Sequence, residues 1–365
     1  MGDDLQSNKT KPIKILFLPN WKVSRLELDS QSIQSPDKIV AGIPYWFFRY
    51  FVNLPDVDVL DKSSAGPFRL LEKITRIYFY QSLKAYVSCK KYDVIISHGA
   101  QSGLVYSLLN SLPGRRKRPK HVIFDIGGMN GARKNIFECL LIRIALASKP
   151  GIICHSSCLL KFYQRTYPSI FPSARFIPFG VDVNDFKPIK CPVKRQILSF
   201  GYSKRDYATL LKAWENIDSD VTLKIIGLKN VNNEAEHVSI LDGVSLTELR
   251  KEIAQSLFIV IPLPYFKYSY GQMSFLQSLS MGKFTIVTYT PSSSDYLKDG
   301  LGAKFVPVGD DQQLAAEIQK ALKDENLLEK QGHTARAYVE SNCSEKTMAK
   351  HIESYLRNLT KRGSH

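Results

Sequence analysis

The sequence lacks the signatures of several large protein classes. It contains neither a GxGxxG fingerprint nor a GxxxxGK[ST] loop after the first strand pattern of either half, which argues against a dinucleotide enzyme and a P-loop nucleotidase. No apolar run reaches the roughly eighteen residues of a membrane-spanning helix. The polar first ten residues do not resemble a signal peptide.

Paired cysteines are also missing. The six cysteines, at positions 89, 139, 154, 158, 191 and 343, form no CxxC motif and show no zinc-site spacing with histidine. A chain of 365 residues can bury thiols without bridging them. We therefore predict reduced cysteines, no bound metal and a cytoplasmic location.

Acidic residues are scarce relative to basic ones, with 34 Asp and Glu against 50 Lys and Arg and a formal charge of +16. Such an excess suits nucleic acid, an anionic membrane face or phosphorylated small molecules. Because no nucleic-acid motif is visible, we predict no nucleic-acid partner. The densest basic run, GRRKRPK at 114–120, is either a solvated loop or a contact with an anionic partner.

Short apolar runs alternate with helical patterns along the chain. The first series of strands is expected at 13–19, 93–99, 121–128, 150–157 and 174–182, with a helical aromatic segment at 41–54 and one long basic helix at 66–93. The second series is expected at 195–201, 221–227, 257–264, 283–289 and 303–309. Its helices are expected at 206–217, 246–256, 271–282 and 310–324, the last capped by Asp310 or Asp311, before a helical tail at 327–359. This alternation predicts two doubly wound parallel α/β sheets.

The domain boundaries follow from the same pattern. We predict a flexible N-terminus at 1–12, a Rossmann-like domain at 13–185 and a second Rossmann-like domain at 186–345. The Pro-rich DFKPIKCPVK stretch lies at their seam. A C-terminal helix at 346–365, ending in a tag-like GSH, is expected to return to the first domain. Ligands should lie at the carboxyl ends of the strands, in a cleft that the two domains face.

Three motifs in this order resemble the family 4 (group 1) glycosyltransferases of the GT-B fold. They are IPFGVDVNDFKP at 177–188, ILSFGYSKRDYATLLKAW at 197–214 and YGQMSFLQSLSMGKFTIVT at 270–288. The resemblance implies a hexosyltransferase that moves a sugar from a nucleotide-diphosphate sugar, most simply a UDP-sugar, to an acceptor hydroxyl. It also implies a donor site in the second domain, an acceptor site in the first, retention of configuration and neither a cofactor nor a catalytic metal.

The donor site should carry positive charge, because the departing diphosphate is anionic. Gly201, Lys204 and Arg205 follow a strand, although the family usually has an arginine where this chain has Tyr202. We predict that Lys204 and Arg205 bind the diphosphate, the alternative being two solvated side chains. A second contribution is expected at Gly271, where the N–H groups of Gln272, Met273 and Ser274 start a helix; the alternative there is an ordinary glycine-led helix start.

The commonest pattern of the family carries two glutamates separated by seven residues, and this chain lacks both. When the chain is aligned with the family on LQSLSMGK, Ser269 stands at the first glutamate position. Gln277 stands at the second, whose glutamate holds the ribose in the family. An amide still hydrogen-bonds a hydroxyl. We therefore predict a variant donor site in which Tyr270 and Gln272 take over part of the missing role.

In the first domain, two strand ends offer catalytic candidates. Asp125 lies nearer to the strand that carries a histidine in the family and could orient the acceptor or act as a base; a turn cap is the alternative. His98 is either functional or a packing residue. His155 and Ser156 are expected to be structural.

The acceptor is expected to be a glycan or a lipid-linked molecule. Six basic residues at 69–91 and the aromatic segment at 41–54 predict docking on an anionic membrane surface, unless the aromatics form core. Two other functions stay open. One is a sugar-nucleotide epimerase or phosphorylase of the same fold, and the other is a nucleotide-sugar-binding protein without catalysis.

Overall fold

The computed structural model divides the chain into two compact units. It describes residues 11–28, 34–62, 67–112, 118–131, 136–218, 220–228 and 237–361. The first unit contains the chain up to Ile153, Tyr167–Ala174 and the chain from Ile352 onward. The second contains Cys154–Thr166 and Arg175–His351. Each unit is built on its own six-stranded sheet, as the alternating pattern predicts.

The sheet of the first unit begins at an edge strand that the sequence did not predict. In spatial order its strands are β4 (Asp56–Val59), β1 (Lys14–Leu18), β5 (Val94–His98), β6 (Lys120–Asp125), β7 (Gly151–Cys154) and β8 (Ala174–Phe176). The pairings from β4 to β6 are parallel. Strands β5 and β7 are buried along their whole length, as expected when helices cover both faces of a parallel sheet.

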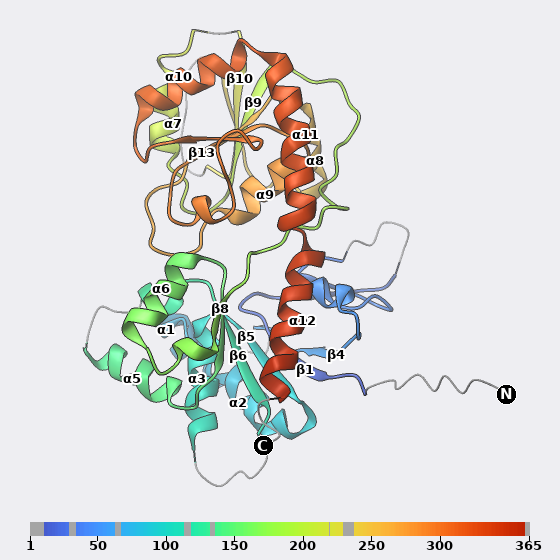
Figure 1. The fold of residues 1–365 in the computed structure, drawn as a ribbon, viewed down its shortest axis with the longest axis vertical. Helices are drawn as coiled ribbons and strands as arrows, with labels where there is room; N and C mark the ends of the chain where they lie inside the picture. Colours follow the sequence, from blue (N-terminus) through green and yellow to red (C-terminus); the bar gives the residue numbers. More distant parts are fainter. Residues whose placement is uncertain are drawn as a thin grey trace, which may run out of the picture. The chain divides into compact units, whose positions relative to one another are not determined.

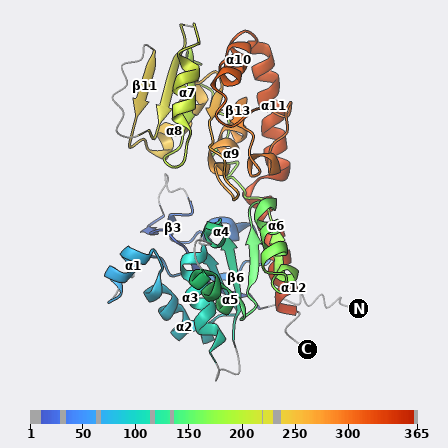
Figure 2. The ribbon, with the colours of Figure 1, turned by 90° about the vertical axis from the view of Figure 1, so that its left-hand side faces the viewer.

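Helices and short elements surround this sheet. Neighbouring helices α2 (Phe79–Ser88), α3 (Ala100–Ser111) and α5 (Ile136–Leu146) form a layer (Figures 1 and 2). The smaller elements are β2 (Ser24–Leu26), β3 (Lys38–Val40), η1 (Trp46–Tyr50), α1 (Arg69–Thr75), η2 (Cys89–Lys91), α4 (Gly128–Gly131) and η3 (Phe171–Ser173). Strands β2 and β3 pair with each other in a separate two-stranded sheet. Most of the basic run, 114–117, lies outside the described residues.

The expectation of one long basic helix at 66–93 is wrong, because the first helix ends at Thr75. The Thr75 hydroxyl donates to the carbonyl of Leu71 and accepts from the N–H of Ile77. Arg76 then adopts the left-handed conformation with φ 56°. Side chains that hydrogen-bond to nearby backbone compete with helix continuation, so α1 and α2 are separate helices.

The aromatic segment at 41–54 forms core rather than an exposed surface. Its only regular element is the 3₁₀ helix η1, and Trp46, Phe47 and Phe48 are buried. The ring of Phe17 on β1 contacts those of Trp46 and Phe48 at centroid distances of 5.9 and 5.8 Å. The expectation that these aromatics contact a membrane is therefore wrong, and the alternative reading as core is confirmed.

The second unit follows the predicted order closely. Its strands, all paired in parallel, are β11 (Val238–Leu241), β10 (Thr222–Ile226), β9 (Gln196–Phe200), β12 (Ile259–Ile261), β13 (Thr285–Thr288) and β14 (Ala303–Val306). Its helices are α6 (Ser157–Thr166), α7 (Tyr207–Trp214), α8 (Leu246–Gln255), α9 (Gln272–Ser280), η4 (Ser293–Asp295), α10 (Asp311–Leu322) and α11 (Glu325–Asn342). Of these six strands, only β11 was not predicted.

Two helix ends refine the sequence expectations. The carboxylate of Asp310 accepts the N–H of Gln313 at 2.8 Å, so Asp310 rather than Asp311 caps α10. The expected helical tail at 327–359 is two helices, because the chain turns at Cys343 before α12 (Glu345–Lys361). The residues of α12 from Ile352 onward cluster with the first unit.

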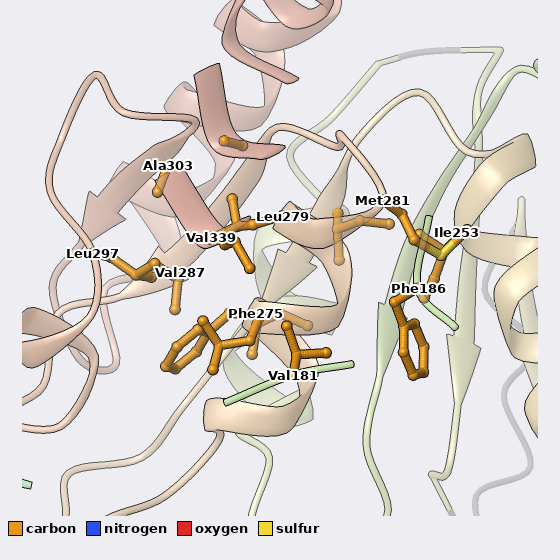
Figure 3. Packing of buried hydrophobic residues seen from close by; sticks show 14 of the residues in the cluster. Val181, Phe186, Ile253, Phe275, Leu279, Met281, Val287, Leu297, Ala303 and Val339 are labelled. Atoms are coloured by element: carbon orange, nitrogen blue, oxygen red, sulfur yellow. The ribbon is translucent and has the colours of Figure 1, made fainter. Parts of the chain in front are cut away.

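Helix α9 lies inside the core of the second unit. Figure 3 shows Phe275 and Leu279 of α9 among Val287 of β13 and Val339 of α11. All residues of α9 except Met273 are buried. Packing of this kind resists displacement, so the N-terminus of α9 has a fixed position in its unit.

All six cysteines are free, as predicted. Cys89, Cys154 and Cys343 are buried, and the other three are half-buried. None of the helices in the described ranges is sufficiently long and apolar to cross a membrane.

Adding one methyl group at Gly332 tests how closely α11 packs on the end of α9. Glycine to alanine normally stabilises a helix interior by about 0.5–1 kcal/mol. At Gly332, however, a Cβ would lie 2.1 Å from the carbonyl oxygen of Gly282. We expect Gly332→Ala to lower the free energy of unfolding by about 1–3 kcal/mol in chemical denaturation. The control, His333→Ala at the next and exposed position, should change it little; equal effects would contradict the packing.

Candidate functional site

The second unit has a cavity of about 410 Å³ at the carboxyl ends of β9 and β10. Parallel α/β sheets bind ligands at this end. The cavity is lined by residues of the β9–α7 loop, the start of α8 and the start of α9: Phe200, Gly201, Tyr202, Ser203, Arg205, Ile226, Val244, Leu249, Ser269, Tyr270, Gly271, Gln272, Met273, Ser274 and Gln277. It therefore brings together every donor-site residue predicted from the sequence except Lys204.

Arg205 is the only cation among the lining residues. Its guanidinium donates to the carbonyls of Phe200 at 3.2 Å and Ser203 at 3.0 Å, and to the Ser274 hydroxyl at 2.6 Å. Burial lowers the pKa of Arg205, and no carboxylate within the described ranges forms an ion pair with it. A largely buried cation without a counter-charge is costly, so this side chain is poised for an anionic ligand.

The absence of a side chain at Gly201 leaves the space that the guanidinium of Arg205 occupies. Its φ is +142°, and a Cβ on this residue would lie 2.5 Å from Nε of Arg205. A side chain here would therefore displace the guanidinium from the pocket. In the sequence, Gly201 stands out only because it follows a strand. The close approach of the Arg205 guanidinium explains why this residue is a glycine.

Gly271 precedes the N-terminus of α9 with a φ of +84°, and a Cβ there would lie 2.8 Å from a methyl group of Leu263. The Ser274 N–H donates to the Gly271 carbonyl at 3.1 Å. Of the three N–H groups expected to face a ligand, those of Gln272 and Met273 have no acceptor within the described part of the chain. The start of a helix attracts anions through such N–H groups and the helix dipole.

Ser269 and Gln272 belong to a buried hydrogen-bond network. The carbonyl of His155 accepts from the Ser269 hydroxyl at 2.7 Å and from the Tyr296 hydroxyl at 2.6 Å. The Gln272 amide donates to Ser269 and, at 2.8 Å, to Ser292. The serine at the first glutamate position thus fixes the chain that leads into α9.

His155 occupies a structural position. Its Nδ1 lies 2.8 Å from the Ile177 carbonyl, and burial lowers the pKa of its imidazole to about 4. The ring is therefore neutral near pH 7. This agrees with the expectation that His155 has a structural role.

Gln277 differs from Gln272 in having no hydrogen-bond partner for its side chain among the residues described. It lines the cavity and is only 7% exposed. Buried polar side chains in proteins are nearly always hydrogen-bonded. The amide atoms of Gln277 are not among the buried polar atoms that lack a partner, so they are open to the cavity, where water or a polar ligand group can pair with them.

Lys204 lies outside the cavity lining. It is exposed, with φ 49°, and its ammonium lies 4.6 Å from the ring centre of Phe266 and 4.8 Å from that of Tyr268. Its Nζ also donates to the Tyr268 hydroxyl. Aromatic faces attract a cation, so Lys204 is held beside the loop that precedes α9.

The sequence analysis missed the apolar part of the cavity. Ile226, Val244 and Leu249 come from the end of β10, the loop before α8 and α8 itself. They are ordinary aliphatic residues far apart in the chain. No motif marks them, and only the topology of the sheet brings them to one wall.

In the first unit, His98 and Asp125 lie at the ends of the adjacent strands β5 and β6, where His98 pairs with Phe124. Both are buried. The His98 ring meets that of Trp21 edge-on at 4.6 Å, and Asp125 accepts the Gly127 N–H at 2.9 Å. The structure thus places the two candidates on neighbouring strand ends, and each also has the structural contacts considered as its alternative.

Comparison with known proteins finds a family match within the second unit. Residues 195–324 match the family model described as glycosyl transferases group 1. The match contains every donor-site residue predicted from the sequence, from Gly201 to Gln277. This part of the second unit is therefore similar to group 1 glycosyltransferases. A search of curated protein sequences found no match.

Solved structures extend the likeness to nearly the whole chain. A sucrose-phosphate synthase from Thermosynechococcus elongatus aligns with a TM-score of 0.67 and 15% identity over 96% of this chain and all of that one. HepE from Anabaena, solved with UDP, aligns with a TM-score of 0.64 and 14% identity over 95% and 100%. A Rickettsia africae glycosyltransferase gives 0.63 and 13% over 96% and 100%. At these identities the likeness shows the fold, which is GT-B as predicted.

Replacing each of the two glutamines of α9 with leucine should change the free energy of unfolding by different amounts. Gln272→Leu removes buried hydrogen bonds and leaves Ser292 and Ser269 short of a partner, so we expect a loss of about 1–3 kcal/mol. Gln277→Leu removes a side chain with no protein partner and should be neutral or stabilising. Chemical denaturation without ligand measures both; a loss at Gln277 as large as at Gln272 would contradict the assignment.

Proposed function

We propose that the protein transfers a sugar from a UDP-sugar to an acceptor hydroxyl, with retention of configuration and without a catalytic metal. The observation that carries the proposal is the partly buried guanidinium of Arg205, which contacts the first turn of α9 in one cavity without a carboxylate partner. The group 1 match of the same residues supports it.

Sugar transfer requires stabilisation of the departing diphosphate. Arg205 would supply positive charge, and the N–H groups of Gln272 and Met273 would supply fixed donors at the helix start. Since these groups are already held by the protein, they would need little rearrangement as charge develops. Lys204, beside the same loop, would add a second and more exposed positive charge.

The nucleoside would occupy the rest of the cavity. The amide of Gln277 can donate to and accept from ribose hydroxyls, and the apolar wall of Ile226, Val244 and Leu249 suits a base. HepE, which has this fold, was solved with UDP and with UDP-glucose. This favours uridine as the base.

The acceptor would be activated in the first unit. We propose that Asp125 orients the acceptor hydroxyl or accepts its proton, and that His98 contacts the reacting sugar. Asp125→Asn keeps the oxygen that accepts from Gly127 and removes the carboxylate charge. Turnover should therefore fall far more than donor affinity.

Substitution of Arg205 tests the proposed diphosphate contact. Arg205→Met should weaken UDP binding in calorimetry by about 10- to 100-fold, the range for a lost hydrogen bond to a charged group. Lys204→Met should have a smaller effect in the same direction. Lys323→Met, at an exposed position on the end of α10, is the matched control and should bind UDP normally. Unchanged affinity in the Arg205 variant would remove the proposed diphosphate contact.

Measuring turnover of a UDP-sugar distinguishes a transferase from an epimerase and from a binding protein. Release of UDP from a UDP-sugar that depends on an added glycan or glycolipid acceptor supports a transferase. Conversion of the UDP-sugar without any acceptor would favour an epimerase. Tight UDP-sugar binding without conversion against any acceptor would favour a binding protein.

We also propose that the enzyme docks on an anionic membrane through α1. This helix has no buried residue, and Leu70 and Ile74 are 72% and 73% exposed. Arg69, Lys73 and Arg76 accompany them. Figure 2 shows α1 at the periphery of its unit, beyond α2. Exposed aliphatic and basic side chains on one short helix suit a surface of anionic lipid.

Vesicle co-sedimentation tests this docking. Binding should rise with the fraction of anionic lipid and fall at high salt, because each basic residue near the surface contributes about 1 kcal/mol. Replacing both Leu70 and Ile74 with Glu should abolish binding, whereas Val308→Glu, an exposed aliphatic position in the second unit, should not. Equal binding to neutral and anionic vesicles would contradict the proposal.

A further inference from the structure

Three aromatic rings lie around the ammonium of Lys204. They belong to Phe266, Tyr268 and Tyr270, which occupy alternate positions of the loop that precedes α9. Their ring centres lie 4.6, 4.8 and 5.2 Å from Nζ of Lys204. The ring of Phe266 also contacts the rings of Tyr268 and Tyr270, at centroid distances of 5.2 and 5.4 Å. All three rings are close enough to attract the cation, and we call these three residues the aromatic cage.

The contacts of Lys204 are specific. Its φ of 49° is uncommon for a residue other than glycine and persists where surrounding contacts determine it. Its ammonium donates to the hydroxyl of Tyr268. Within the described ranges, Lys204 forms no ion pair with a carboxylate. Aromatic faces and one hydroxyl therefore fix where this charge lies, and they leave its net charge uncompensated.

Tyr270 connects the cage to the donor cavity. It is one of the lining residues, and its ring centre lies 5.9 Å from the guanidinium carbon of Arg205. Two cations thus contact one ring, and the cavity lining contains no carboxylate. Lys204 itself is not part of the lining. Its charge is therefore placed to meet a part of the ligand that extends beyond the cavity.

The cage prepares Lys204 for binding. A lysine side chain is long and flexible, and ordering it on binding costs conformational entropy. Here the rings already hold the ammonium in the protein without a ligand. An ammonium has three N–H donors, of which Tyr268 accepts one, and Lys204 is exposed. Donors remain for an anion that approaches from the cavity.

We infer that Phe266, Tyr268 and Tyr270 are positioning residues, which hold the ammonium of Lys204 where it binds the terminal phosphate of a nucleoside diphosphate. The inference rests on the proposed function and deepens it, because it explains how this site prefers a diphosphate to a monophosphate. Phe266 and Tyr268 act through Lys204 and do not contact the phosphate themselves.

Calorimetry of the full chain with UDP and with UMP tests the inference. Phe266→Leu and Tyr268→Leu should each weaken UDP binding about two- to fivefold, the range for a lost cation–ring contact, and should leave UMP binding unchanged. Tyr268→Phe keeps the ring and should retain most of the affinity for UDP. Tyr265→Leu is the matched control, because Tyr265 is exposed on the same loop and outside the cage, and it should change neither affinity.

The ratio of the two affinities separates positioning from a merely structural role. Loss of loop structure would lower UDP and UMP binding by the same factor, and that result would overturn the inference. Stronger UDP binding in the Phe266 and Tyr268 variants would also overturn it, because the rings would then withhold Lys204 from the ligand.

A double-mutant cycle shows whether the rings act through Lys204. Lys204→Met combined with Tyr268→Leu should bind UDP as weakly as Lys204→Met alone, because both substitutions remove the same contact. Losses that multiply in the double variant would contradict the assignment.

The Arg205→Met variant keeps this test separate from the proposed function. If it weakens UDP binding while the Phe266 and Tyr268 variants bind UDP normally, the cage inference alone fails and the donor site stands. If the parent protein does not bind UDP, the donor site fails, and the cage inference fails with it.

Discussion

The guanidinium of Arg205 is the constraint around which the proposed donor site is organised. It is anchored by the carbonyls of Phe200 and Ser203 and by the hydroxyl of Ser274, so one side chain joins the β9–α7 loop to the start of α9. Burial without a carboxylate makes this charge unfavourable in the empty protein. An anionic ligand would relieve that cost, and the geometry of Gly201 preserves the space that the side chain needs.

The structure gives a local explanation for the absence of the two glutamates that the resemblance leads one to expect. At the first position, Ser269 is drawn into the network on the His155 carbonyl and fixes the approach to α9. At the second, Gln277 keeps a polar side chain at the cavity wall without a protein partner. The pocket lining therefore contains no carboxylate, and the anionic diphosphate would meet no repulsion there. We infer a modified donor site rather than a lost one.

The sequence was informative where local chemistry decides the structure. Buried parallel strands such as β5 and β9 appear as continuous apolar runs, and Gly271 before a helical pattern located the start of α9. Other features depend on partners far away in the chain. The short edge strands β4 and β11 carry no strong pattern, and the break at Arg76 depends on side-chain contacts of Thr75. The cavity also depends on distant partners, because Ile226 and Leu249 are brought together only by the topology of the sheet. The contacts of Lys204 with aromatic rings could not be predicted from the residues next to it in the sequence.

A crystal structure of the protein with UDP tests the central claim most directly. The account predicts a phosphate oxygen about 3 Å from the guanidinium of Arg205, in reach of the N–H groups of Gln272 and Met273, with the ribose against the amide of Gln277. UDP bound with its phosphates away from Arg205, or with Gln277 turned from the ribose, would contradict it.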